Sequence, residues 1–121
     1  MNNLYFLLTT ALILGGCQTI RYEMHSPTTD AGRACVTQCA GIRETCRGNE
    51  IRRAKSEREE CEHQAEQSLR ICLNSADTKE KRNECEKKKP GCWSYENETR
   101  CEEEYRSCYV QCGGKVIKIV E

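Results

Sequence analysis

The sequence contains little of what normally builds a hydrophobic core. It has one Phe, one Trp and two Pro, and only 12 Leu, Ile or Val residues follow residue 16. Acidic and basic residues balance at 19 each, so the basic surplus expected of a nucleic-acid-binding protein is absent. So few apolar side chains would by themselves predict disorder, because the surface they bury cannot offset chain entropy. Something other than an apolar core must hold this chain together.

The sequence also lacks the motifs of common catalytic and cofactor sites. It contains no C-x-x-C redox pair, no G-x-S-x-G, no phosphate-binding loop and no HExxH. His25 and His63, its two histidines, do not stand at a metal-ligand spacing. We therefore expect no catalytic residues, no cofactor, no bound metal, no small-molecule substrate and no nucleic-acid partner.

Cysteine is abundant, with 11 residues in a chain of 121. A content of about 9% is typical of disulfide scaffolds in oxidising compartments. The length allows one small domain. The composition therefore predicts a single domain that is held together by disulfides.

An apolar run without charged side chains occupies residues 4–16. It is too short to cross a bilayer and has the length of the apolar part of a signal peptide. The run ends in Leu14-Gly15-Gly16-Cys17, which resembles the lipobox of bacterial lipoproteins. This resemblance implies that residues 1–16 are a signal peptide removed just before Cys17. It also implies that the Cys17 thiol carries diacylglycerol and that its amine is acylated.

The residue after the lipobox bears on the location of the protein. Residue 18 is Gln and not Asp. Under the enterobacterial sorting rule, this resembles a signal for the outer membrane. The resemblance thus implies a chain anchored in the bacterial outer membrane by lipid on Cys17 and facing the periplasm. Three acyl chains suffice for stable anchoring, whereas one does not. The expected partners are the membrane and an envelope protein that the sequence does not identify.

Without Cys17, ten cysteines remain, an even number that allows five disulfides. Six of them form two groups of mirror-image spacing, C-x3-C-x6-C and C-x6-C-x3-C. Offsets of 4, 7 and 11 keep residues on one face of a helix, so the groups can pair along two antiparallel helices. The residue numbers in each pair then add up to 147, a constant register that also sets Ile42 opposite Tyr105. The predicted pairs are Cys35–Cys112, Cys39–Cys108 and Cys46–Cys101.

The four remaining cysteines nest inside this arrangement, as Cys61–Cys92 and Cys72–Cys85. The crossed pairing, Cys61–Cys85 with Cys72–Cys92, suits an antiparallel pair less well but stays open. The register slips here, because 15 residue steps separate Cys46 from Cys61 and only nine separate Cys92 from Cys101. Either the second arm is partly extended near Pro90-Gly91, or the first arm bends near Gly48-Asn49.

These features predict an all-α fold: a disulfide-stapled antiparallel helical hairpin over residues 30–113, bent or divided into three or four helical segments. Thr29-Asp30 can cap the first arm, and Gly113-Gly114 can end the last. The tip is expected near residues 74–78, with Asp77 and Glu80 as a capping-box-like start of the return arm. The twin C-x3-C hairpin resembles that of small mitochondrial intermembrane-space proteins, a resemblance that implies shared architecture only.

The two tails read as strands. Residues 17–29 form a lipid-anchored linker with a strand-like pattern over 19–25, and the tail 114–121 is rich in β-branched residues. The hairpin brings them to one end, where they can pair as a β-ribbon, stay frayed, or add a strand to a partner's sheet. Near the Pro90-Gly91 break, we expect Trp93 and Tyr95 to pack on the chain, with an exposed contact patch as the alternative.

The expected function is that of a non-catalytic, disulfide-stabilised binding or structural module on a lipid tether. The alternative is a thiol-rich helical protein that binds Cu(I) or another soft metal ion. It rests on the preference of soft ions for thiolates and on a resemblance to bacterial copper-storing bundles, which use C-x3-C pairs. The alternative requires free thiols, whereas the module requires disulfides.

Overall fold

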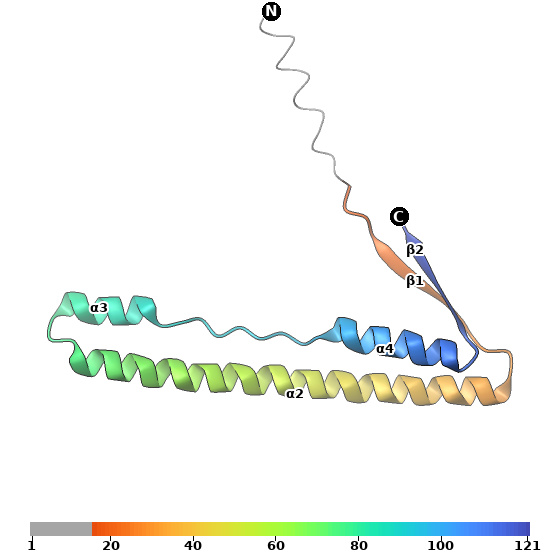
Figure 1. The fold of residues 1–121 in the computed structure, drawn as a ribbon, viewed down its shortest axis with the longest axis horizontal. Coiled ribbons are helices and arrows are strands. Elements are labelled where there is room, and N and C mark those ends of the chain that lie inside the picture. The colour runs from red at the N-terminus through yellow and green to blue at the C-terminus, as the bar shows by residue number, and fades with distance from the viewer. Residues whose placement is uncertain (1–15) are drawn as a thin grey trace, which may run out of the picture.

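The computed structural model describes residues 16–121, so most of the predicted signal peptide lies outside the described residues. The described chain is mostly helical and ends in a small two-stranded antiparallel sheet (Figure 1). The predicted disulfide-stapled helical hairpin with a β-ribbon is therefore confirmed. Its elements are β1 (Ile20–His25), α2 (Asp30–Ser75), α3 (Lys79–Lys88), α4 (Glu98–Gln111) and β2 (Lys115–Val120).

Helix α2 is the backbone of the molecule. Its 46 residues span about 69 Å without a break, so the chain does not bend at Gly48-Asn49. Helices α3 and α4 lie on one side of α2 and are joined by an extended segment, residues 89–97 (Figure 1). The register slip is thus absorbed entirely by the second arm, the first of the two predicted explanations.

Polar side chains and glycine set the helix ends. The Thr29 and Thr78 hydroxyls accept backbone N–H groups in the first turns of α2 and α3. The predicted cap at Asp77 is wrong by one residue, because Asp77 instead forms an ion pair with Lys81 at 2.6 Å. Gly113 follows α4 with φ of 89°, a left-handed conformation that favours glycine.

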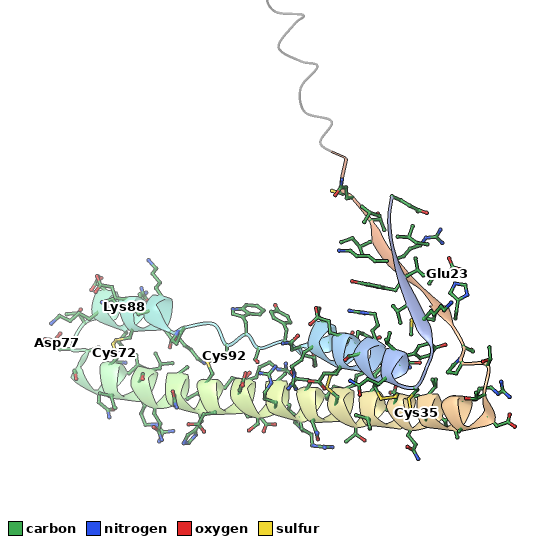
Figure 2. All side chains as sticks on the ribbon, turned by 45° about the vertical axis from the view of Figure 1, so that its right-hand side comes forward. Glu23, Cys35, Cys72, Asp77, Lys88 and Cys92 are labelled. Carbon is green, nitrogen blue, oxygen red and sulfur yellow. A yellow bond between two sulfur atoms is a disulfide. The ribbon has the colours of Figure 1, made fainter. Side chains whose placement is uncertain are left out.

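Five disulfides join α2 to the returning chain, with Cα separations of 5.6 to 5.8 Å. They coincide with the pairs predicted from the spacing, and the crossed alternative does not occur. Figure 2 shows Cys35 near the ribbon end of α2 and Cys72 near the tip. The pairs are Cys35–Cys112, Cys39–Cys108, Cys46–Cys101, Cys61–Cys92 and Cys72–Cys85.

The core consists of sulfur and small side chains. Among the described residues, the buried apolar side chains are those of four cysteines, three alanines and Tyr109. Ala54 and Ala65 lie on the same face of α2 as its cysteines and let the returning chain approach closely. The disulfides therefore replace the missing apolar core.

The tails pair as a ribbon, from Ile20 opposite Val120 to His25 opposite Lys115. Of the three alternatives for the tails, the ribbon is thus the correct one. The ribbon contacts α4, where the Arg106 guanidinium lies 3.9 Å from the centre of the Tyr22 ring. Both chain tails leave the hairpin at the end where Cys35 lies (Figure 2).

None of the helices within residues 16–121 combines the length and the apolarity needed to cross a bilayer.

Candidate functional site

The extended segment 89–97, here called the strap, presents two aromatic rings to solvent. Along it, Cys92, Ser94 and Glu96 are partly buried, whereas Trp93 and Tyr95 are 79% and 73% exposed. This period of two is that of an extended chain lying on α2. The expectation that Trp93 and Tyr95 pack on the chain is wrong, because the alternation turns both side chains outward.

Two arginines of α2 hold the strap by its backbone. Arg58 donates to the Ser94 carbonyl at 2.6 Å, and Arg53 donates to the Tyr95 carbonyl at 2.9 Å. The Ser94 hydroxyl in turn donates to Glu57 at 2.5 Å. Successive carbonyls of an extended chain point to opposite edges, so Arg58 and Arg53 bind the strap from its two edges. The aromatic pair therefore stands on an anchored backbone.

A buried carboxylate, Glu50, joins the end of the strap to both helices. Its side chain is 6% exposed and accepts from Arg53 at 2.7 Å, from the Asn97 backbone N–H at 2.9 Å and from Arg100 at 2.8 Å. The hydrogen bonds from Arg53, and then that from Asn97, lower the pKa of Glu50 to about 2. Glu50 is therefore ionised at neutral pH, and charge-assisted hydrogen bonds of this kind are the strong ones.

The pKa values of two neighbouring groups also shift in the directions that favour their charged forms. Hydrogen bonds from Ser94 and Arg53 lower the pKa of Glu57, and hydrogen bonds to Glu50 and Glu57 raise the pKa of Arg53. The polar composition of residues 47–60 by itself indicates a solvent-exposed helix, yet Glu50 within this stretch is buried. One signal could have found it: Glu50 follows Cys46 by four residues and so lies on the cysteine face of α2.

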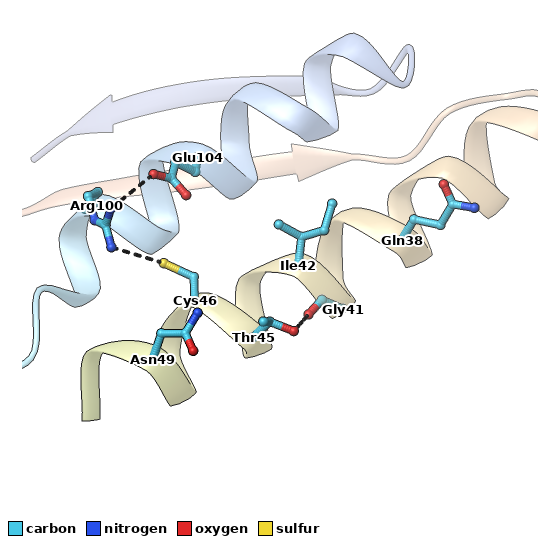
Figure 3. A pocket seen from close by; sticks show the side chains of 8 residues that line it. All are labelled: Gln38, Gly41, Ile42, Thr45, Cys46, Asn49, Arg100 and Glu104. Atoms are coloured by element: carbon cyan, nitrogen blue, oxygen red, sulfur yellow. Dashed lines mark hydrogen bonds and ion pairs between the residues drawn. The ribbon is translucent and has the colours of Figure 1, made fainter. Parts of the chain in front are cut away.

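A groove of about 670 Å³ runs between α2 and α4 (Figure 3). Ile42 lies in it and is 59% exposed. The Tyr105 ring, opposite Ile42 in the predicted register, lies 4.2 Å from the Arg43 guanidinium, one residue further along α2. The lining mixes polar and apolar groups and comprises Gln38, Gly41, Ile42, Thr45, Cys46, Asn49, Arg100 and Glu104.

Two disulfides pack against each other near the ribbon. The sulfur atoms of Cys35, Cys39 and Cys112 lie within 4.8 Å of one another, and those of Cys39 and Cys112 are 3.4 Å apart. All three belong to disulfides, and a disulfide sulfur lacks the thiolate charge that soft metal ions prefer. This cluster would offer metal ligands only after reduction.

Cys17 differs from every other cysteine in the described residues. It is exposed and takes part in no disulfide. It lies three residues before β1, so the ribbon separates it from the hairpin. The structure therefore divides the cysteines as the sequence predicted: ten in the scaffold and one apart.

Comparison with known proteins places the chain by family alone. No curated protein and no solved structure matches it. A protein-family model matches residues 5–120, from the N-terminal apolar run to the end of β2. Because this match covers almost the whole chain, the protein belongs to the family that this model defines.

Proposed function

We propose that this protein is a lipid-anchored component of the bacterial outer membrane that faces the periplasm. In this proposal, lipid on Cys17 holds the chain at the membrane, and the hairpin acts as a non-catalytic binding or structural module for another envelope protein. The hairpin's own character, a disulfide-stabilised helical module, is evident from its five disulfides.

The observation that carries the proposal is the division of the cysteines. Cys17 directly follows Leu14-Gly15-Gly16, is exposed, and lies outside the disulfides. Five disulfides persist in oxidising compartments such as the periplasm, where lipid-anchored proteins of this kind are exposed. A cysteine left over in such a chain calls for another role, and lipidation is the one that its preceding residues favour.

The rigidity of the hairpin supports a binding role. The Cys61–Cys92 disulfide in the strap, the Cys46–Cys101 disulfide in α4 and the hydrogen bonds from Arg53 and Arg58 fix the backbone of Trp93 and Tyr95 before any partner binds. Aromatic rings on a preorganised backbone lose little conformational entropy on binding. Such residues are enriched among those that dominate binding energy.

Intact mass spectrometry of the membrane-extracted protein tests the proposal. We expect the mature chain to begin at Cys17 and to carry the added mass of diacylglycerol and an amide-linked acyl chain. It should take up no alkylating agent before reduction and ten equivalents after it. The matched control is Cys17→Ser, which should keep all five disulfides and lose the lipid.

Two results would contradict the proposal. A Cys17 without lipid in a host with lipoprotein-processing enzymes would remove the anchor. Free thiols among the ten hairpin cysteines of the native protein would remove the scaffold and would favour the Cu(I)-binding alternative, which soft thiolates support. Copper titration of the unreduced protein then decides between a metal-binding role and incomplete oxidation.

A further inference from the structure

The exposed aromatic pair lies beside a cluster of positive charge. Lys87 and Lys88 end α3, Lys89 begins the strap, and all three are exposed. Trp93 and Tyr95 follow within six residues on the same extended segment. Trp and Tyr are the side chains that favour the boundary between lipid and water, and lysine near them is attracted to anionic headgroups. We call residues 87–95 with their exposed side chains the basic-aromatic face.

The strap is not suited to recognition through its backbone. Adding a partner strand requires free N–H and C=O groups along an edge. Here Arg58 and Arg53 already occupy the Ser94 and Tyr95 carbonyls from opposite edges. Two carbonyls that a partner strand would need are therefore taken, which favours recognition through the exposed side chains, the two rings and the nearby lysines.

The basic-aromatic face lies on the same side of the molecule as the tether. Helix α3, the strap and α4 all cover one side of α2, and the ribbon leaves toward that side (Figures 1 and 2). Cys17 precedes the ribbon, so a lipid on it would lie on the same side. At the Cys17 end of the ribbon, the paired side chains of Ile20 and Val120 are each about half exposed, which suits a position close to lipid.

We propose that the basic-aromatic face is a second membrane contact, which binds anionic phospholipid headgroups through Lys87–Lys89 and inserts Trp93 and Tyr95 at the lipid-water boundary. The proposal rests on the proposed function for the orientation of the anchored protein. It assigns the two exposed rings to lipid, so an envelope partner would bind another part of the hairpin. The hairpin would then lie along the membrane instead of projecting from it. Charge complementarity favours a lipid surface over a protein partner, since the adjoining α3 and Lys89 carry six basic and three acidic side chains.

The single Trp of the chain allows a direct test. The lipidated protein is reconstituted in phosphatidylethanolamine vesicles that contain about a quarter phosphatidylglycerol, an anionic lipid. We expect the emission of Trp93 to shift to shorter wavelength and to be quenched by lipids brominated on their acyl chains. In the control Trp93→Tyr/Glu59→Trp, the single Trp lies on the side of α2 away from the strap. Glu50 faces the strap, and Glu59 lies nine residues, or half a turn, from it. The Trp of this control should stay unquenched. Unquenched Trp93 on a protein whose mass shows the lipid would overturn the proposal.

A second measurement separates this proposal from the lipid anchor itself. The mature chain with Cys17→Ser, its disulfides intact, is titrated with the same vesicles and with neutral phosphatidylcholine vesicles. We expect binding to the anionic vesicles only, weakened about tenfold to thirtyfold by Lys88→Gln/Lys89→Gln. The matched pair Arg52→Gln/Lys55→Gln removes the same charge from another face and should change binding less than twofold.

The outcomes are distinct. If Cys17 carries no lipid but the protein binds vesicles through its lysines, the proposed lipid anchor is refuted and the membrane-binding role of the basic-aromatic face stands. If the two double variants lose vesicle binding equally, or if the protein does not prefer anionic vesicles, the membrane-binding role of the basic-aromatic face is refuted and the lipid anchor is unaffected. In that case the exposed rings would have to serve a protein partner.

Discussion

Helix α4 and the strap cover neighbouring stretches of the same helix by different means. Three disulfides join α4 to α2 in constant register, so that each pair of residue numbers adds up to 147. The strap contains a single disulfide, Cys61–Cys92, at its fourth residue. Beyond Cys92, charged side chains of α2 hold it.

The difference follows from what each segment does with its backbone. A helix satisfies most of its own N–H and C=O groups, so α4 needs only staples and a few side-chain contacts. An extended segment does not, and each of its polar groups that leaves water needs a partner. Arginines and Glu50 of α2 provide these partners. Disulfides are therefore sufficient to hold a helix against α2, whereas the extended strap also needs a network of polar side chains.

Removing a disulfide should have the largest effect, and the size should depend on the loop that it closes. In each variant the other four disulfides stay closed, so the entropy regained depends on the short ring that the missing disulfide divided. Cys39–Cys108 lies four residues from Cys35–Cys112 on each arm, and Cys72–Cys85 closes the tip over 13 residues. On chain entropy, we expect Cys39→Ala/Cys108→Ala and Cys72→Ala/Cys85→Ala each to lower the free energy of unfolding by about 3 kcal/mol. Guanidinium unfolding of the two variants measures both values. A loss at the tip well above the loss at Cys39–Cys108 would show that packing at the tip adds to loop closure.

Breaking the polar network should affect the strap more than α4. Glu50→Gln leaves one acceptor oxygen where Arg53, Arg100 and the Asn97 N–H now share two. We expect a smaller loss of stability than for either disulfide, with faster hydrogen exchange of the Asn97 amide and unchanged exchange in the middle of α4. The control Glu59→Gln, an exposed residue whose pair with Lys55 measures 3.7 Å, should shift the free energy by under ~0.5 kcal/mol. Uniform acceleration of exchange across α4 would contradict a local role.

Acid should weaken the strap while leaving the staples intact. The pKa of Glu50 falls from its ordinary value of 4.5 to about 2 in the folded protein. The unfolded chain therefore binds more protons between these values, and Glu50 stabilises the fold fully above about pH 4.5 and progressively less as pH falls through about 2. The lowered pKa of Glu57 acts in the same direction. Unfolding free energies measured from pH 6 to pH 2 should fall less steeply for Glu50→Gln, and an identical slope would refute the assignment.

The sequence predicted the stapled part of this fold because cysteines constrain one another in pairs. Mirror spacing and a constant sum pointed to Cys35–Cys112, Cys39–Cys108 and Cys46–Cys101 without any knowledge of the helix ends. The tip was also predictable, to within one residue. Thr78 caps α3 in place of Asp77 because both residue types are good caps, and only the path of the chain chooses between them.

The strap could not be predicted in the same way. With no continuous apolar face on α2, periodicity gave no sign that Glu50 is buried among residues that are nearly all polar. The outward direction of Trp93 and Tyr95 depends on hydrogen bonds from Arg53 and Arg58, which lie about 36 to 42 residues away in the chain. Such contacts leave no local pattern, so aromatic residues beside a chain break suggested packing.

The smallest effect is expected from the contact between Arg43 and Tyr105, which tests whether anything besides disulfides holds α4 against α2. The Arg43 guanidinium lies 4.2 Å from the centre of the Tyr105 ring, between the Cys39–Cys108 and Cys46–Cys101 staples. A cation–π contact at a partly exposed site contributes about 0.5–1 kcal/mol. A double-mutant cycle with Arg43→Gln and Tyr105→Leu should return a coupling of this size by guanidinium unfolding. The exposed neighbour Ile42→Ala should change the free energy by under ~0.5 kcal/mol. Coupling well above 1 kcal/mol would mean that side-chain contacts, as well as disulfides, hold α4 on α2. The strap and α4 would then differ only in how much each depends on side-chain contacts.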